Sequence, residues 1–272
     1  MIIAQISDTH LTLGTPDAER RLDDFARTIA DINALDPLPD AIVHTGDIVH
    51  NGRPDEYARA AAVLAKARPP VYVLPGNKDD RANLRAAFSA ECYCASGSEF
   101  IDYAVEHFAV RLIALDTLQP GANRGGFRPA QARHLSALLA VAPNKPVAVF
   151  THHPPFEVTV GPDRFHFETT AGMTRLREAL GQSERIAAVF SGHVHRAAAG
   201  RIGRIPASVV PCIATALRKG DYPPSVKTHP VYHLHHFDPA CGFVTASRVV
   251  AMAGAPGERC SAPIAAESLA GS

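Results

Sequence analysis

The chain has 272 residues, of which 46% are hydrophobic, and its 27 Lys and Arg residues balance its 27 Asp and Glu residues. This composition excludes a disordered chain and allows a sizeable core. The zero net charge gives no general attraction to nucleic acid polymers or anionic membranes, and no run approaches the roughly 18 apolar residues of a membrane span, so neither these partners nor a span is expected.

The first part of the chain alternates short apolar runs with longer amphipathic stretches. In the first amphipathic stretch, Phe25, Ile29 and Ile32 recur at spacings of three and four, which is typical of a helix with one apolar face. Pro54 suits the first position of a later helix. We therefore expect strands at residues 2–6, 41–43 and 71–74, and helices at residues 18–35, 54–68 and 80–88.

The remainder of the chain changes from this alternation to a pattern dominated by strands. After a hairpin come two further helices and two strands, and only strand-like segments follow Gly200. These elements are expected at residues 100–105 and 110–115 (the hairpin), 129–141 and 171–181 (helices), and 147–150, 186–190, 208–213, 231–237 and 243–250 (strands). The whole order predicts a four-layer αββα sandwich of two mixed β-sheets flanked by helices, with one domain over residues 1–251 and a flexible tail over residues 252–272.

The five cysteines lack the spacing of a metal site, since Cys92 and Cys94 are two residues apart and do not form a C-x-x-C pair. The N-terminal stretch MIIAQISDTH also lacks the basic segment of a signal peptide. Reduced thiols and a cytoplasmic location are therefore expected for this protein.

Five short polar motifs share one feature, because each directly follows a predicted strand. In α/β sheets, ligands collect where loops leave the carboxyl ends of strands, so five such loops at one edge would bring these side chains together. Residues two apart in extended chain project to the same side, which lets each D-x-H or H-x-H pair face one point. The motifs are Asp8-Thr9-His10, Gly46-Asp47, Gly76-Asn77, His152-His153 and Gly192-His193-Val194-His195.

The side chains of these motifs make a mixed set of metal ligands with two carboxylates, one amide oxygen and four imidazoles. Such a set suits Mn, Fe, Co, Ni or Zn better than Ca or Mg. Seven ligands exceed what one transition ion with an open position can use, so two ions that share one carboxylate are predicted. Each motif alone is common, and the prediction rests on the order and placement of all five. The seven predicted ligands are Asp8, His10, Asp47, Asn77, His152, His193 and His195.

In their order from about residue 2 to residue 196, these motifs resemble the calcineurin-like metallophosphoesterase superfamily, whose pattern is D-x-H, GD, GN-H-D/E, H and GH-x-H. The stretches GDIVHNGRPDEY, PGNKDD and FTHHPP are similar to those of class III cyclic nucleotide and glycerophosphodiester phosphodiesterases. The resemblance implies one metal held by Asp8, His10, Asp47 and His195, and a second held by Asp47, Asn77, His152 and His193. It also implies that Asp47 bridges the two metals and that His153 lies nearby, in an outer position or against the substrate.

One residue departs from the family pattern, because Lys78 stands where the family has a histidine after the Asn of its GN motif. The family histidine contacts the phosphoryl group and is suited to protonate the leaving oxygen. A lysine attracts a phosphate oxygen as a point charge, but it is a poorly matched proton donor near neutral pH. Lys78 and His153 are therefore predicted as catalytic residues, and the alternative for Lys78 is a side chain that points to solvent or pairs with Asp79 or Asp80.

Other histidines lie close to the motifs or outside them. His50 and Asn51 follow Asp47 closely, and the resemblance places them at the substrate mouth, so they are predicted to bind substrate together with Lys78 and His153. His233, His235 and His236 fall outside the matched pattern. These three are interpreted as residues of a sheet surface or of an interface.

The expected function is that of a dinuclear metal-dependent phosphodiesterase, with two Mn, Fe, Zn or Co ions and a metal-bound hydroxide that attacks phosphorus. The expected partner is a small phosphodiester, such as a glycerophosphodiester or a cyclic nucleotide, and a homo-oligomer stays open. A phosphomonoesterase, or a phospholipid or pyrophosphate hydrolase, is an alternative on the same site. An alternative from another class is a metal-binding interaction module that has lost catalysis.

Overall fold

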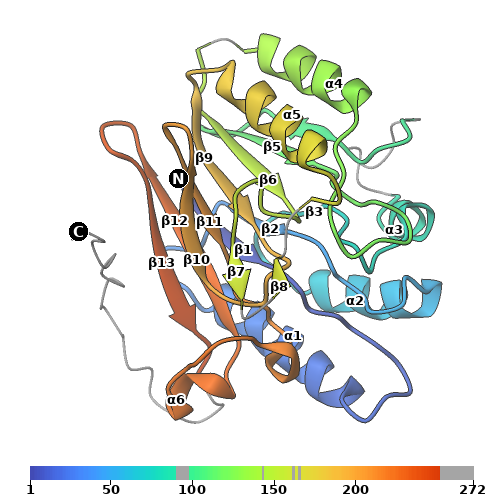
Figure 1. Ribbon diagram of the computed structural model, residues 1–272. Helices are drawn as coiled ribbons and strands as arrows, with labels where there is room; N and C mark the ends of the chain where they lie inside the picture. The colour runs from blue at the N-terminus through green and yellow to red at the C-terminus, as the bar shows by residue number, and fades with distance from the viewer. Residues whose placement is uncertain (90–97, 143, 161–162, 165–166, 252–272) are drawn as a thin grey trace, which may run out of the picture.

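The computed structural model describes residues 1–89, 98–142, 144–160, 163–164 and 167–251. The predicted tail at residues 252–272 and the pair Cys92 and Cys94 lie outside the described residues. Two stacked β-sheets form the centre of the molecule, and helices cover them on the outside (Figure 1). In the part of the chain that the structure describes, no helix combines the length and the apolarity needed to cross a membrane.

The first sheet has five strands in the order β13-β12-β1-β2-β3. Strand β1 (Ile2–Ile6) runs parallel to β2 (Ala41–His44), which runs parallel to β3 (Val71–Val73). Strand β12 (Val231–Asp238) is antiparallel both to β1 and to the edge strand β13 (Gly242–Val249). The sheet is therefore mixed, with three parallel strands whose carboxyl ends share one edge.

The second sheet has six strands in the order β10-β11-β9-β6-β5-β4. Its four inner strands are parallel, and β4 and β10 run antiparallel to them at the two edges. The strands are β4 (Tyr103–Val105), β5 (Arg111–Leu115), β6 (Val147–Thr151), β9 (Ile186–Ser191), β10 (Ala198–Ile202) and β11 (Ile205–Val209), and a separate hairpin joins β7 (Thr159–Val160) to β8 (Asp163–Arg164).

The helices divide into two groups, one for each sheet. Helices α1 and α2 bury apolar side chains against the first sheet, with α3 beside α2. Helices α4 and α5 pack side by side on the outer face of the second sheet. The helices are α1 (Ala18–Asn33), α2 (Pro54–Leu64), α3 (Arg81–Ala87), α4 (Pro129–Ala140), α5 (Thr170–Gly181) and the short α6 (Pro224–Lys227), with a 3-10 turn at Thr215–Leu217.

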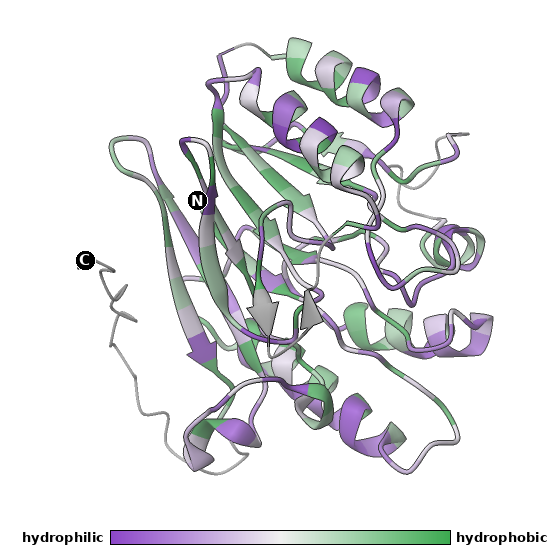
Figure 2. Ribbon diagram, viewed as in Figure 1, coloured by the Kyte–Doolittle hydropathy of each residue, from purple (hydrophilic) through white to green (hydrophobic). Residues whose placement is uncertain are grey.

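Strand β6 shows why the second sheet is buried on both faces. Its sequence VAVFT has no solvent-facing alternation, and all five residues are buried. Ala148 and Phe150 belong to the core that includes the space between the sheets, whereas Val147 and Val149 pack with the helices α4 and α5. A parallel strand that is covered on both faces typically has such a continuous apolar sequence. Figure 2 shows these central strands as hydrophobic.

The predicted αββα sandwich is confirmed. The differences are the hairpin of β7 and β8, which was not predicted from the sequence, and changes in the C-terminal part. Strand β10 was not predicted, because Ala198, Ala199 and Gly200 are poor strand formers. The strand expected at residues 208–213 is instead β11, which begins at Ile205 after a turn at Gly203, whose φ is +58°. It ends at Val209, which pairs with Ala198 at the start of β10. The short helix α6 was also missed.

The interpretation of the C-terminal histidines as surface residues is wrong for two of them. His233 and His235 are buried, and only His236 is exposed. The ring of His235 stacks on Phe190 with 3.7 Å between centroids, and its Nε2 lies 2.9 Å from Gln5 Oε1. A polar partner from β1 therefore compensates the burial of this imidazole between the sheets.

Candidate metal centre

The seven predicted ligands converge at the edge where the parallel strands of both sheets end. The loops that carry them are joined by hydrogen bonds, since Asp8 N donates to Gly46 O at 2.9 Å and Gly192 N donates to His152 O at 3.0 Å. His193 N donates across the sheets to Asp8 Oδ2 at 2.9 Å. The ligands follow β1 (Asp8, His10), β2 (Asp47), β3 (Asn77), β6 (His152) and β9 (His193, His195).

The backbone at these positions adopts a conformation that side chains rarely tolerate. A positive φ in a residue other than glycine costs about 1–3 kcal/mol and persists only where the surrounding structure enforces it. In the described ranges, six such residues occur, and five of them are predicted ligands, which indicates that the loops are shaped to aim these side chains. The five are Asp8 (φ 54°), His10 (φ 43°), Asp47 (φ 51°), His193 (φ 71°) and His195 (φ 60°), and the sixth is Ala142.

A glycine at position 46 allows two of these loops to touch. A Cβ atom on Gly46 would lie 2.6 Å from Gly76 N and 2.7 Å from His152 Nδ1. Its φ of +93° is also a conformation that favours glycine. The glycines of the GD and GN motifs therefore keep side chains out of the space where these two loops and His152 meet.

The first cluster consists of Asp8, His10, Asp47 and His195, each of which offers one ligand atom within 4.8 Å of the others. His195 Nε2 lies 3.2 Å from Asp8 Oδ1, and His10 Nε2 lies 3.4 Å from Asp47 Oδ2. The Nε2 atoms of His10 and His195 face each other at 3.0 Å. All four side chains therefore point at one position that water barely reaches.

This first cluster fits a metal ion. His195 Nδ1 donates to Leu217 O at 2.9 Å, which leaves the Nε2 lone pair directed at the cluster. Asp8 Oδ1 is buried and has no hydrogen-bond partner among the described residues. A buried carboxylate oxygen and converging imidazole lone pairs are costly without a cation, and they are the donor set that a transition ion needs.

The pKa values of the two carboxylates in this cluster are shifted in opposite directions. Burial would raise the pKa of Asp8, but His195 and His10 hold it well below its usual value. Burial, reinforced by the charges of Asp8 and Asp79, raises the pKa of Asp47 well above its usual value. Burial also lowers the pKa of His10 to about 3, against the opposing effect of Asp8. The side chains of this cluster therefore do not supply enough positive charge to stabilise both carboxylates in the ionised form, and bound cations would supply it.

The second cluster lies next to the first and shares Asp47 with it. His152 Nε2 is 3.1 Å from Asn77 Oδ1 and 3.5 Å from Asp47 Oδ1. His152 Nδ1 donates to Thr45 O at 2.7 Å, so Nε2 is the nitrogen that faces the ligands. Ring nitrogens of His152, His153 and His193 lie within 4.8 Å of one another. Burial lowers the pKa of all three, which keeps these imidazoles neutral near pH 7.

Lys78 lies at the rim of the second cluster and is partly buried. Its backbone N donates to Asp47 Oδ1 at 2.7 Å, and its Nζ donates to Asn123 Oδ1 at 3.0 Å. Asp79 is occupied by other donors, which include Gly76 N and the Tyr57 hydroxyl, both at 2.8 Å. The alternative in which Lys78 pairs with Asp79 is therefore not what the structure shows.

The other predicted substrate residues have neighbours of their own. His50 Nδ1 lies 3.3 Å from His10 Nδ1, and the two rings meet edge to face. Asn51 Nδ2 donates to Glu56 Oε1 at 2.7 Å and to Thr12 Oγ1 at 3.3 Å, which ties it to the start of α2. Substrate contacts by these two residues stay predictions.

Sequence reasoning missed Asn123, whose side chain reaches the GN loop. Its Oδ1 accepts from Lys78 Nζ and lies 3.5 Å from Asn77 Nδ2. It belongs to the connection between β5 and α4, which carries no motif of its own. Only the glycines at positions 121, 125 and 126 mark this stretch as a turn-rich loop, and they do not indicate where it lies.

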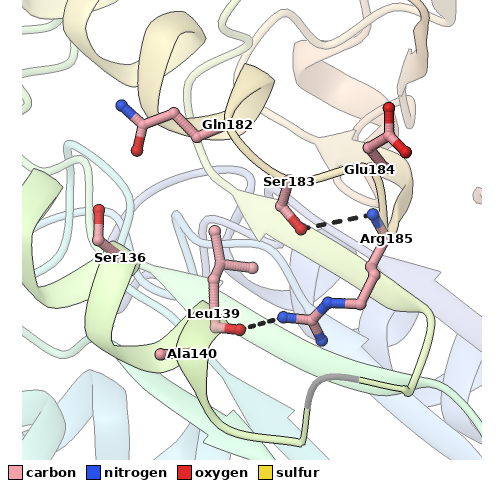
Figure 3. Close-up of a pocket in the computed structure, with 7 residues that line it drawn as sticks. All are labelled: Ser136, Leu139, Ala140, Gln182, Ser183, Glu184 and Arg185. Atoms are coloured by element: carbon pink, nitrogen blue, oxygen red, sulfur yellow. Dashed lines mark hydrogen bonds between the residues drawn. The ribbon is translucent and has the colours of Figure 1, made fainter.

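A separate hollow of about 390 Å³ lies between the ends of α4 and α5 (Figure 3). It sits at the amino ends of β6 and β9, opposite the edge that carries the ligands. The guanidinium of Arg185, which lines this hollow, donates hydrogen bonds to the backbone carbonyls of Leu139 and Ala142. This arrangement caps the end of α4 and gathers no catalytic groups.

Comparison with known proteins identifies the family of this chain. The profile of the calcineurin-like phosphoesterase family matches residues 1–197. A probable glycerophosphodiester phosphodiesterase GpdQ from Arcobacter nitrofigilis is 32% identical over 253 residues, which cover 90% of this chain and 92% of that protein. A cAMP/cGMP dual specificity phosphodiesterase from Mycobacterium tuberculosis is 30% identical over 221 residues, which cover 76% of this chain and 66% of that protein.

The fold is also found among solved structures. A dimetal phosphatase from Danio rerio superposes with a TM-score of 0.66 at 15% identity, over 92% of this chain and 99% of that chain. The family match includes all five motifs from Asp8 to His195, so the resemblance inferred from them is confirmed. The chain belongs to the calcineurin-like phosphoesterase family.

Proposed function

We propose that this metallophosphoesterase hydrolyses small phosphodiesters, with two transition-metal ions held by the seven converging side chains. The observation that carries the proposal is the position of Asp47 between the two clusters. Its Oδ2 lies 3.4 Å from His10 Nε2, and its Oδ1 lies 3.5 Å from His152 Nε2. One carboxylate that faces two ligand sets is the arrangement that a shared metal ligand requires.

The names of the relatives support the class of substrate. The proteins compared above are named for glycerophosphodiesters and for cyclic nucleotides, and both are small diesters with one phosphorus. We infer that this chain acts on a diester of that size. The zero net charge accords with this inference, because a nucleic acid polymer is bound through many phosphate contacts.

The predicted ions are Mn, Fe, Zn or Co, which the mixed nitrogen and oxygen ligands suit. Such ions polarise a phosphoryl oxygen and lower the pKa of bound water. The chain's own part is to hold them, through Asp8, His10 and His195 on one side and Asn77, His152 and His193 on the other.

Around this centre, Lys78 offers a cation that can attract a phosphate oxygen of the substrate. Its ammonium is already oriented by Asn123 at 3.0 Å, so little side-chain freedom is lost on binding. Catalysis by Lys78 and His153, and substrate contacts by His50 and Asn51, stay predictions. So do a cytoplasmic location and a homo-oligomer.

The proposal is tested with metal-stripped protein that is reloaded with Mn²⁺ and given a panel of substrates. The panel contains bis(p-nitrophenyl) phosphate, a glycerophosphodiester, cyclic AMP, p-nitrophenyl phosphate and a pyrophosphate diester. We expect the diesters to be hydrolysed, and Asp47→Asn to lose at least about 100-fold in rate, because it weakens both ion positions. Asp23→Asn, at an exposed position of α1, is the matched control.

The other outcomes separate the alternatives. Faster hydrolysis of the monoester than of any diester would favour a phosphomonoesterase, and selective cleavage of the pyrophosphate would favour a pyrophosphate hydrolase. Two bound ions with no turnover of any substrate would favour an interaction module that has lost catalysis.

A further inference from the structure

The second cluster contains an imidazole that the sequence motifs do not assign to a metal. His152 and His193 are predicted ligands, and the ring of His153 contacts the rings of both. Its ring centroid is 4.4 Å from that of His193 and 4.8 Å from that of His152. One ring nitrogen from each of the three histidines lies within 4.8 Å of the other two. Three imidazoles therefore surround one position.

The orientation of His153 is fixed by contacts on its far side. Its Nδ1 lies 2.8 Å from Thr117 Oγ1, and the same hydroxyl accepts from His153 N at 3.3 Å. Thr117 Oγ1 has two lone pairs, so it can accept from Nδ1 as well as from His153 N, and in that tautomer Nε2 keeps its lone pair. This is the same tautomer that Thr45 O imposes on His152 and that Leu217 O imposes on His195.

The Nε2 atom of His153 is not hydrogen-bonded by any residue that the structure describes. The side chain is fully buried. The chain also packs tightly around the ring, since a Cβ on Gly125 would lie 2.7 Å from His153 Cγ. A buried polar nitrogen that is held in one orientation and left unpaired needs a partner that arrives from outside the chain.

We propose that His153 is an additional ligand of the second metal ion, beside the predicted ligands Asp47, Asn77, His152 and His193. Three imidazoles would then hold this ion together with the amide oxygen and the shared carboxylate. This inference rests on the proposed function in one respect, because it presupposes two ions in one centre. It replaces an outer or proton-donating role for His153 with a direct bond from Nε2 to the metal.

The assignment makes the two ion positions chemically different. The first position has two carboxylates, Asp8 and Asp47, which suit Mn or Fe. The second position has a majority of neutral imidazole nitrogens, which suit Zn²⁺ or Co²⁺. A centre built in this way would load two different metals when both are offered, with the imidazole-preferring ion beside His153.

The test is metal binding by the stripped, full-length protein, measured by calorimetric titration with Co²⁺ and by the visible absorption spectrum of bound Co²⁺. The wild-type protein is expected to bind two equivalents. His153→Ala should bind the first equivalent normally and the second more than about 100-fold more weakly, a loss beyond that of an outer partner, with a changed Co²⁺ spectrum. Thr117→Val keeps the imidazole but loses its orienting partner, so a smaller loss at the same equivalent is expected.

A matched control is His233→Gln, since His233 is another buried imidazole, with 4% exposure, on a different strand. It should leave both equivalents unchanged. Binding of two ions by His153→Ala with wild-type affinity and spectrum would overturn the proposal, whether or not turnover falls. That result would leave His153 outside the metal's ligands, as a buried imidazole on which the backbone of Asn123 acts.

The two proposals fail separately. Wild-type protein that binds two ions but hydrolyses no diester would overturn the proposed function and leave the ligand assignment standing. Normal turnover in the wild type, with unchanged second-ion affinity in His153→Ala, would overturn only the ligand assignment. If His153→Ala does not fold, Thr117→Val decides, because an unchanged second equivalent in that variant contradicts the orienting role from which the bond was inferred.

Discussion

Lys78 and Asn123 form a hydrogen bond at the rim of the metal centre, with 3.0 Å between Lys78 Nζ and Asn123 Oδ1. The same Asn123 oxygen lies 3.5 Å from Asn77 Nδ2, so one residue of the β5–α4 connection contacts both Asn77 and Lys78. When Asn77 Nδ2 faces Asn123, its Oδ1 faces His152. Asn123 therefore orients the lysine that replaces the family histidine and also the predicted amide ligand.

Removing this contact should weaken substrate binding more than chemistry. In Asn123→Ala, the ammonium of Lys78 loses its acceptor and regains side-chain freedom, so we expect the KM for a small diester to rise about fivefold, which corresponds to about 1 kcal/mol at a partly exposed contact. Steady-state kinetics on one diester measure this. Asn123→Asp keeps an acceptor oxygen and serves as the control, and equal KM values in the wild type and Asn123→Ala would contradict the orienting role.

The identity of residue 78 should decide which leaving groups are tolerated. Lys78→Ala is expected to slow the hydrolysis of aryl and alkyl diesters alike, because both lose the cation near the phosphate. Lys78→His is expected to raise the alkyl rate relative to the aryl rate by at least about tenfold, because an imidazole is a better matched acid for a poor leaving group. Comparing both variants on a matched pair of diesters measures the ratio. Unchanged rates in both variants would remove Lys78 from the mechanism.

The convergence of the seven predicted ligands could be inferred from sequence, because each ligand is marked by its local sequence. Each lies directly after an apolar run, and the parallel strands fix where those runs end, so a motif at the end of β1 and one at the end of β9 must meet. The same reasoning could not find the orientation of His153. That orientation is set by Thr117 and Gly125, which belong to another loop, and neither carries a motif that indicates the contact.

The errors in the fold have a similar origin. The small residues of β10 have little strand preference, and only pairing with β11 makes them a strand. His235 appeared to belong on a surface because histidine is polar. It is buried because Gln5 from β1 and Thr245 from β13 supply partners to its two ring nitrogens. Both outcomes depend on neighbours that are remote in sequence.

Gly46 should be intolerant of any side chain. In Gly46→Ala, the new methyl group would meet Gly76 N and His152 Nδ1 at distances below 3.0 Å, so the GD and GN loops must separate. We expect a loss of about 3 kcal/mol in the free energy of unfolding, together with weaker metal binding. Urea unfolding and metal titration measure the two effects.

Gly14→Ala is a matched control for Gly46→Ala, because Gly14 also has a positive φ, of +73°, but its Cβ would meet no described atom within 4 Å. Gly14→Ala should lower the free energy of unfolding by only about 1 kcal/mol, because of backbone strain, and should leave metal binding intact. Similar losses in the two variants would show that the φ angle, and not the contact between the loops, makes glycine necessary at position 46.

Asp102 should make the stability of the protein depend on pH near neutrality. This buried carboxyl accepts from Asp116 N at 2.7 Å, and burial, followed by the charge of Asp116, raises its pKa from 3.8 to about 7. The folded state therefore holds the proton more tightly than the unfolded state. Its contribution to stability is fully present below pH 3.8, falls as the pH rises toward 7, and then levels off.

Replacing this carboxyl by an amide isolates its contribution. Asp102→Asn can still accept from Asp116 N but cannot ionise, so the free energy of unfolding of the wild type should fall relative to that of Asp102→Asn by about 2–3 kcal/mol between pH 5 and pH 8. Urea unfolding of both proteins at the two pH values measures the difference, and Asp23→Asn at its exposed position controls for the loss of one charge. A constant difference between the wild type and Asp102→Asn across this range would mean that Asp102 is ionised in the folded protein at pH 5, with Arg81 close enough to lower its pKa and offset its burial.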